Sequence, residues 1–166
     1  QQNAVKMSEK MQDKQYTFED YRRIVDTLRS EEGCPWDRAQ TKESLKPFMI
    51  EEMVEAAAAV NTNDMENLCE ELGDQLLLIL LQCSIARENG SFSLDDVIQK
   101  AAEKMIRRHP HVFPDENGEK HEADWDEIKR QEKAGKTPEQ LRRAKEAVKE
   151  AALETVEYIQ KHMLCG

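Results

Sequence analysis

Four acidic residues on two consecutive segments are the strongest candidates for chemistry in this 166-residue sequence. Glu52 and Glu55 are three positions apart in the first segment, and Glu71 and Asp74 are three positions apart in the second. Residues with this spacing project about 60° from each other around a helix, so each pair would point to one side. Asp74 lies just before the apolar run 76–81, which predicts a largely buried helix. Two such helices packed antiparallel would bring both pairs of carboxylates together.

Carboxylates gathered in this way need a counter-charge. Like charges raise one another's pKa, and each buried ion carries a large desolvation cost. A divalent cation would offset that cost, and oxygen ligands without His or Cys favour Mg²⁺ or Mn²⁺ over Zn²⁺. The sequence therefore predicts a metal site, with Glu51 as a neighbouring fifth carboxylate. The alternative is that these residues form solvated helix faces, as expected in a chain with 35% charged residues.

A basic face on a later helix is the second candidate. Its residues fall within about 100° of the helix circumference, and they are Lys100, Lys104, Arg107 and Arg108. Ala101, Met105 and Ile106 occupy the opposite side and are predicted to face the core. Lys supplies point charges and Arg supplies paired donors, which together suit a polyphosphate. The alternative is the solvated face of an amphipathic helix.

Capping residues, helical spacing and Gly or Pro stops predict the elements that would position these residues. Helices are predicted over 17–30, 44–60, 65–88, 93–108 and from about 138 onward, with a short helical turn around Trp125. Residues 33–40 contain Gly33, Cys34 and Pro35 and are predicted to form a loop. With 39% hydrophobic and only 5% aromatic residues, the composition favours an all-α, four-helix-bundle-like fold with an extra C-terminal helix over a β-sandwich.

Composition also limits the partners and the location. The formal net charge of −10 opposes binding to nucleic acid or anionic lipid. The apolar run 76–81 is too short for a membrane span, which needs about 20 residues. Four scattered cysteines indicate reduced thiols, so a cytoplasmic location is expected. Residues 1–15 are polar, lack the features of a signal peptide and are predicted to be a disordered leader.

Several sequence blocks, taken in order, resemble the MazG family of nucleotide pyrophosphohydrolases. The blocks are Gly33-Cys34-Pro35-Trp36-Asp37, Gln40-Thr41, Glu51-Glu52-x-x-Glu55, Glu71-x-x-Asp74, the run from Arg107 to Phe113 and the run from Trp125 to Lys129. The resemblance covers residues 16–133, which are expected to form one domain, and leaves 134–166 as a C-terminal amphipathic helix. The chain looks like a single-domain form similar to the N-terminal MazG domain of longer members.

The resemblance implies hydrolysis of nucleoside triphosphates, NTP or dNTP, to the monophosphate and pyrophosphate with Mg²⁺, for which Mn²⁺ is a possible substitute. The implied metal ligands are Glu52, Glu55, Glu71 and Asp74, with Glu51 as a further ligand or the general base. The implied phosphate-binding residues are Lys104, Arg107 and Arg108. The implied contacts to the base are Trp125, Asn67 and Glu70, with Trp36 as a second stacking candidate.

Other function classes remain open at this point. A di-iron or di-manganese bundle would need a Glu-x-x-His pair, which neither acidic helix contains. A zinc site at His109, His111 and His121 competes with a simple helix-terminating turn. The C-terminal part has no second Glu-x-x-Glu with a following Glu-x-x-Asp, so a catalytically weak or non-catalytic dimerisation or regulatory module is the alternative. Leftover apolar surface and the resemblance both predict a homodimer.

Overall fold

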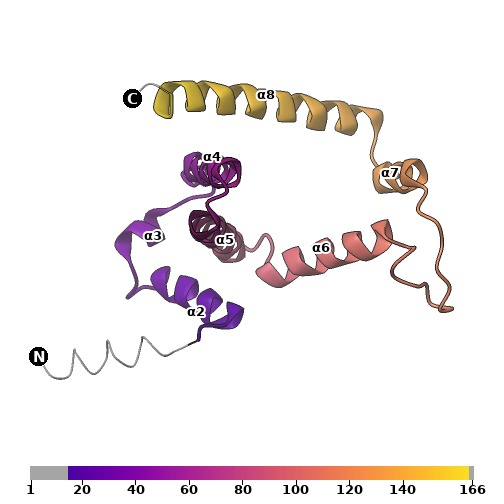
Figure 1. The fold of residues 1–166 in the computed structure, drawn as a ribbon, viewed down its shortest axis with the longest axis horizontal. Coiled ribbons are helices and arrows are strands. Elements are labelled where there is room, and N and C mark those ends of the chain that lie inside the picture. The colour runs from indigo at the N-terminus through magenta and orange to yellow at the C-terminus, as the bar shows by residue number, and fades with distance from the viewer. Residues whose placement is uncertain (1–14, 165–166) are drawn as a thin grey trace, which may run out of the picture.

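The computed structural model describes residues 15–164, and every regular element among them is an α-helix (Figure 1). The helices are α2 (Phe18–Leu28), α3 (Pro35–Ala39), α4 (Lys46–Thr62), α5 (Met65–Glu88), α6 (Leu94–Arg108), α7 (Trp125–Lys133) and α8 (Pro138–His162). The predicted all-α fold with an additional C-terminal helix is confirmed. Except for Gln15, the predicted leader lies outside the described residues.

Helices α2 and α6 begin at the capping residues that the sequence predicts. The Thr17 hydroxyl accepts the backbone N–H of Asp20 at 3.1 Å, and the Asp20 carboxylate accepts the N–H of Thr17 at 3.0 Å. Ser93 and Asp96 form the same reciprocal pair at the start of α6. Each pair satisfies backbone donors that have no partner within the helix, which fixes where the helix begins.

The segment 33–40 is not the predicted loop, because it contains the short helix α3. Pro35 opens this helix, where its fixed φ suits a first turn and its missing N–H breaks no helical bond. Just before α3, the backbone at Gly33 packs closely against the backbone at the end of α2. A Cβ atom there would lie 2.3 Å from the carbonyl oxygens of Thr27 and Leu28, so no larger residue fits without moving the backbone.

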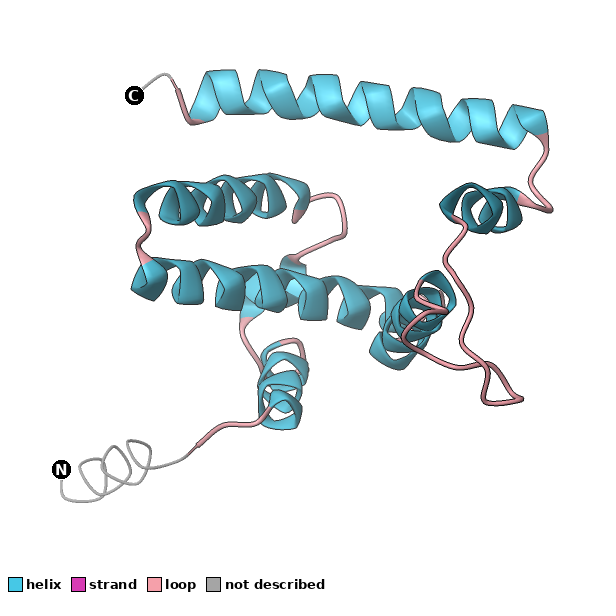
Figure 2. Cartoon of the chain, turned by 45° about the vertical axis from the view of Figure 1, so that its right-hand side comes forward, coloured by secondary structure: helices cyan, strands magenta, loops and turns pink. Residues whose placement is uncertain are grey.

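The core forms around the antiparallel pair α4 and α5, which lie side by side in Figure 2. The connection turns at Asn63, whose φ of 54° is the left-handed conformation that Asn tolerates at a helix end. Helix α2 packs on α5, on the side away from α4 (Figure 1). The buried cluster between these helices consists of Val25, Leu45, Leu78, Leu80, Leu81 and Ile85.

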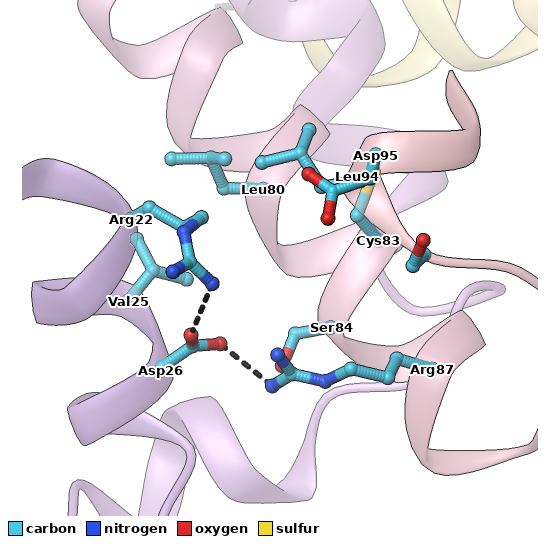
Figure 3. A pocket seen from close by; sticks show the side chains of 10 residues that line it. Arg22, Val25, Asp26, Leu80, Cys83, Ser84, Arg87, Leu94 and Asp95 are labelled. Carbon is cyan, nitrogen blue, oxygen red and sulfur yellow. Dashed lines mark hydrogen bonds and ion pairs between the residues drawn. The ribbon is translucent and has the colours of Figure 1, made fainter. Parts of the chain in front are cut away.

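A small cavity of about 110 Å³ marks where α2, α5 and α6 meet (Figure 3). Beside it, Asp26 accepts from Arg22 of its own helix at 3.4 Å and from Arg87 of α5 at 2.7 Å. The ion pair between Asp26 and Arg87 therefore connects α2 to α5. Since Arg22, Asp26 and Arg87 pair with one another and none of the predicted site residues lines the cavity, we assign it a structural role.

The remaining helices lead away from this core. Leu94 at the start of α6 packs against the buried cluster, and the rest of α6 leads away toward α7 (Figures 1 and 2). The prediction that Ala101, Met105 and Ile106 face the core is therefore wrong: Met105 is 44% exposed and Ile106 is 50% exposed. Helix α8 returns across the outer face of α4. Within residues 15–164 no helix is both long and apolar enough to cross a membrane.

Candidate metal centre

Three of the four predicted metal ligands come together on the α4–α5 pair. Glu52 and Glu55 extend from α4 and Glu71 extends from α5, and one carboxylate oxygen of each lies within 4.8 Å of the others. We call these three residues the carboxylate trio. Glu71 is buried, Glu52 is half-buried and Glu55 is exposed, so the trio is open to solvent on one side.

The charges of the trio are strongly coupled. Burial, a hydrogen bond with the Glu71 carboxyl group and the charge of Asp74 raise the pKa of Glu52 to about 7. The pKa of Glu55 is also raised, first by burial and then by the charges of Glu71, Glu51 and Asp74. Asp74 therefore lies close enough to act on the trio, although it is not one of the three.

The donor set fits a hard divalent cation. Across residues 15–164, no Lys, Arg or His side chain forms an ion pair with the trio, Asp74 or Glu51. The site therefore concentrates negative charge without an internal counter-charge. Carboxylate oxygens in this arrangement suit Mg²⁺ or Mn²⁺ and do not suit a soft metal.

Two contacts that were not predicted brace the helices at the level of the trio. The side-chain amide of Gln75 donates to the backbone carbonyl of Glu52 at 3.2 Å, which joins α5 to α4. The Tyr21 hydroxyl of α2 donates to the carbonyl of Gly73 at 3.3 Å, and burial together with the charge of Asp74 raises the pKa of Tyr21. Tyr21 and Gly73 are 52 positions apart in the chain, so no local sequence pattern indicates this contact.

Glu51 is not one of the three residues of the trio, and its side chain contacts α8. The hydroxyl of Tyr158 donates to Oε1 of Glu51 at 2.5 Å. This hydrogen bond is the main cause of a raised pKa at Tyr158. The two residues are separated by 107 positions in the chain, and no sequence motif links them.

The basic face of α6 is partly occupied by an acidic residue of α7. Arg107 and Arg108 both donate to the carboxylate of Glu132, at 3.0 Å and 2.7 Å respectively. These hydrogen bonds lower the pKa of Glu132 to about 2. Lys100 and Lys104 lie earlier on α6, which leads away from the α4–α5 pair (Figure 1). The structure thus does not place the basic face beside the trio of the same chain.

The residues implied to contact the base are also dispersed. Trp36 on α3 packs edge-on against Phe48, with ring centroids 5.8 Å apart. Trp125 on α7 packs edge-on against His109 at 6.1 Å. Helices α3 and α7 lie on opposite sides of the α4–α5 pair in Figure 1. Asn67 and Glu70 lie near the start of α5, whereas Trp125 begins α7.

A second group of possible ligands lies in the connection between α6 and α7. Asp115, Glu119 and His121 each have one ligand atom within 4.8 Å of the others, but all three residues are exposed. Asp115 accepts from backbone N–H groups of its own loop and pairs with Nε2 of His121 at 2.9 Å. These contacts account for the group as the closure of a loop, and His109 and His111 do not belong to it.

Known proteins resemble this chain over the region that contains the trio. The MazG nucleotide pyrophosphohydrolase domain matches residues 40–113. The nucleoside triphosphate pyrophosphohydrolase/pyrophosphatase MazG of Thermotoga maritima is 50% identical over 119 residues, which cover 72% of this chain and 46% of that protein. The nucleoside triphosphate pyrophosphohydrolase of Escherichia coli K12 is 39% identical over 117 residues, which cover 68% of this chain and 44% of that protein.

A solved structure resembles the fold as well. The crystal structure of a MazG-related protein from Thermotoga maritima matches with a TM-score of 0.50 and 32% sequence identity. The match covers 65% of this chain and 91% of that chain. This chain spans less than half the length of the two curated relatives named above.

Proposed function

Because this chain belongs to the MazG family of nucleotide pyrophosphohydrolases, we propose that it hydrolyses nucleoside triphosphates to nucleoside monophosphates and pyrophosphate. The observation that carries the proposal is the carboxylate trio within the matched segment 40–113. Two relatives of this chain have names that state this activity. The proposal extends that activity to this chain.

We further propose Mg²⁺ as the cofactor, with Mn²⁺ as a substitute. Glu52, Glu55, Glu71 and Asp74 are the proposed ligands, supported by the mutual approach of the trio and by the effect of Asp74 on the pKa of Glu52. When bound, the ion would neutralise triphosphate oxygens and acidify a water molecule. The chain itself holds the carboxylates on two packed helices, so their positions are set before substrate arrives.

The proposed contacts to the substrate follow the basic face and the exposed aromatic residues. Lys104, Arg107 and Arg108 would bind phosphate oxygens, and for the two arginines this requires exchange of Glu132 for phosphate. The proposed contacts to the base are those implied by the family, namely Trp36, Asn67, Glu70 and Trp125. The net charge of −10 supports the absence of a nucleic-acid partner.

A homodimer is the proposed assembly, supported first by the exposed surface of a single chain. The chain of 19.2 kDa exposes 13266 Å², whereas a compact monomer of this mass exposes about 8400 Å². At most about 2600 Å² of this excess can come from the 16 residues outside the described range. A second copy would cover much of the excess.

One face of the α4–α5 pair is suited to that contact. Six apolar residues, each between 44% and 62% exposed, follow it at helical spacing, and they are Met49, Met53, Val60, Met65, Leu72 and Ile79. We call them the apolar stripe. Glu55 is two positions after Met53, and Asp74 is two positions after Leu72, which is about 200° around each helix. A partner seated on the apolar stripe would leave Glu55 and Asp74 open, and its own α6 offers a second basic face.

The alternative function is a catalytically weak or non-catalytic dimerisation or regulatory module. Two observations favour it. Arg107 and Arg108 already pair with Glu132, and α6, which carries the basic face, leads away from the helix pair that carries the trio. Such a module would bind Mg²⁺ or nucleotide without turnover.

Pyrophosphate release from the eight common NTPs and dNTPs, measured with Mg²⁺, with Mn²⁺ and with EDTA, separates the two functions. We expect monophosphate and pyrophosphate in equal amounts with either ion and none with EDTA. The ranking of the eight nucleotides would identify the preferred base and sugar. Folded protein that binds Mn²⁺ but releases no pyrophosphate from any of them would favour the non-catalytic module.

A further inference from the structure

Helix α8 touches the rest of the protein through a few specific polar contacts. No residue of α8, all of which the structure describes, is buried. Its C-terminal half lies over the start of α4, where Lys46 pairs with Glu154 at 2.9 Å. One turn further along, Tyr158 donates to Glu51 and stacks on His162, with ring centroids 4.6 Å apart. The contact is therefore defined by particular side chains and not by a packed core.

The contact with Tyr158 acts on Glu51, an acidic residue that directly precedes Glu52 of the trio. Glu51 projects about 40° from Glu55 around α4, on the side that faces α8. It directly precedes Glu52 and lies about one helical turn before Glu55, although it is not part of the trio. Oε1 of Glu51 accepts from Tyr158, whereas Oε2 accepts no hydrogen bond within residues 15–164.

A carboxylate beside a cation site is drawn toward the ion unless another donor holds it. A hydroxyl bonded to a carboxylate is a strong, charge-assisted donor, and such outer partners orient the groups around metal sites. A general base must lie within hydrogen-bond reach of the proton that it takes from water. The hydrogen bond from Tyr158 holds one oxygen of Glu51 on the α8 side, while the other oxygen accepts no hydrogen bond within residues 15–164.

We propose that Tyr158 is a positioning residue that keeps Glu51 out of the metal ligand set and available as the general base. The inference rests on the proposed function and goes beyond the segment matched by the MazG domain, which ends at residue 113. The proton of the attacking water would pass to Oε2 of Glu51. Tyr158 itself touches neither the substrate nor the metal.

Mn²⁺ binding to the full chain tests the proposal without requiring turnover. The variant Tyr158→Phe removes the hydroxyl and keeps the ring, so Glu51 becomes free to join the ligands. We expect Mn²⁺ to bind about fivefold more tightly to Tyr158→Phe than to the unmodified chain, because a further carboxylate adds charge to the ligand set. The double variant Glu51→Gln/Tyr158→Phe is expected to bind as Glu51→Gln does. Glu154→Gln is the matched control, since it breaks the other polar contact between α4 and α8 and leaves Glu51 alone.

Steady-state kinetics supply the second readout. Tyr158→Phe should lower kcat about tenfold and leave KM within about twofold, because Glu51 loses its orientation while substrate binding persists. In the Glu51→Gln background the same substitution should cause no further loss. Unchanged Mn²⁺ affinity and kcat in Tyr158→Phe would overturn the proposal, as would an equal loss in the Glu51→Gln background.

The outcomes also separate this proposal from the proposed function. An unmodified chain that binds Mn²⁺ but hydrolyses no nucleotide would overturn the proposed function. The Mn²⁺ measurements alone would then support or overturn the placement of Glu51 by Tyr158.

Discussion

Glu52 lies where partial burial and three neighbouring carboxyl groups all oppose its ionisation. Its pKa of about 7 in the folded protein lies above its ordinary value of 4.5. The folded state therefore binds the proton of the Glu52 carboxyl group more tightly than the unfolded state does. The contribution of this protonation to the free energy of unfolding is lost as the pH rises through 7. Ionised Glu52 is also the form that binds a cation, so metal binding should strengthen over the same range.

In EDTA, the melting temperature should fall by a few degrees between pH 5.5 and pH 8, and Mg²⁺ should restore it at pH 8. The variant Glu52→Gln is the control, because an amide does not titrate and should flatten this dependence. Differential scanning calorimetry at several pH values measures both. A fall of the same size in Glu52→Gln would show that another group is responsible.

The residues of the site differ in how far the sequence could predict them. Glu52, Glu55 and Glu71 were predictable because helical spacing fixes the direction of each side chain, and a polar turn forces the two helices into a pair. The bond from Tyr158 to Glu51 was not, because it depends on the path by which α8 returns to α4.

Helix starts and stops were largely encoded locally. Capping pairs at Thr17 and Ser93 mark the starts of α2 and α6, and the predicted limits of α5 at Met65 and Glu88 are confirmed. Two predictions about elements were wrong for physical reasons. Gly33 and Pro35 led to the prediction of a loop, but a proline can also begin a helix, as Pro35 does in α3. The apolar side of the amphipathic helix α6 was predicted to face the core, but only the start of α6 packs against the core of its own chain.

Gly33 provides a stability test at the junction between α2 and α3. A methyl group there would overlap two backbone carbonyl oxygens, so Gly33→Ala should lower the free energy of unfolding by about 2–4 kcal/mol. Gly73→Ala is the control, because no atom outside its own helix lies within 4 Å of the added Cβ. That variant should be up to about 1 kcal/mol more stable, since Ala favours helix. If urea unfolding gives the same change in free energy for Gly33→Ala and Gly73→Ala, Gly33 is not packed closely against the carbonyl oxygens of Thr27 and Leu28.

Arg29 joins three elements through one nearly buried side chain. Its side chain is 6% exposed, and its guanidinium donates to the Glu88 carboxylate at 2.6 Å and to the carbonyl of Asp37 at 2.5 Å. Arg29→Met should cost about 2–3 kcal/mol of unfolding free energy, because the carbonyl and the carboxylate both lose their donor.

Arg142→Met is the matched comparison for Arg29→Met. Arg142 also forms ion pairs with two acidic residues, but on the exposed surface of α8. Such pairs contribute at most about 1 kcal/mol. Urea unfolding that shows the same loss for both arginines would refute the role of Arg29 as a link between helices.

The whole molecule is extended in a way that the composition did not predict. An all-α class followed from the charged, aromatic-poor composition, and apolar surface left over on the helices predicted a homodimer. The face that remains open was not predictable, because it depends on which sides α2, α7 and α8 take. In the structure that face is the apolar stripe.

Ile79→Lys tests the apolar stripe as the dimer contact. Light scattering should give about twice 19.2 kDa for the unmodified chain and 19.2 kDa for Ile79→Lys, since a buried unpaired charge opposes association. Leu153→Lys on α8 is the control, an equally drastic change at an exposed apolar residue outside the stripe, and should leave the dimer intact. If the unmodified chain is a monomer at micromolar concentration, the proposed homodimer is wrong. If Leu153→Lys dissociates the dimer and Ile79→Lys does not, the dimer contact lies on α8 and not on the apolar stripe.

Phosphorus NMR of one nucleoside triphosphate incubated with the chain tests the central claim most directly. With Mg²⁺, the three triphosphate signals should be replaced by those of pyrophosphate and a monophosphate. The signals should not change with EDTA, and Asp74→Asn should slow the conversion at least about 100-fold while helical circular dichroism stays the same. Formation of a diphosphate and inorganic phosphate, or conversion that persists in EDTA, would contradict a metal-dependent pyrophosphohydrolase built on this carboxylate trio.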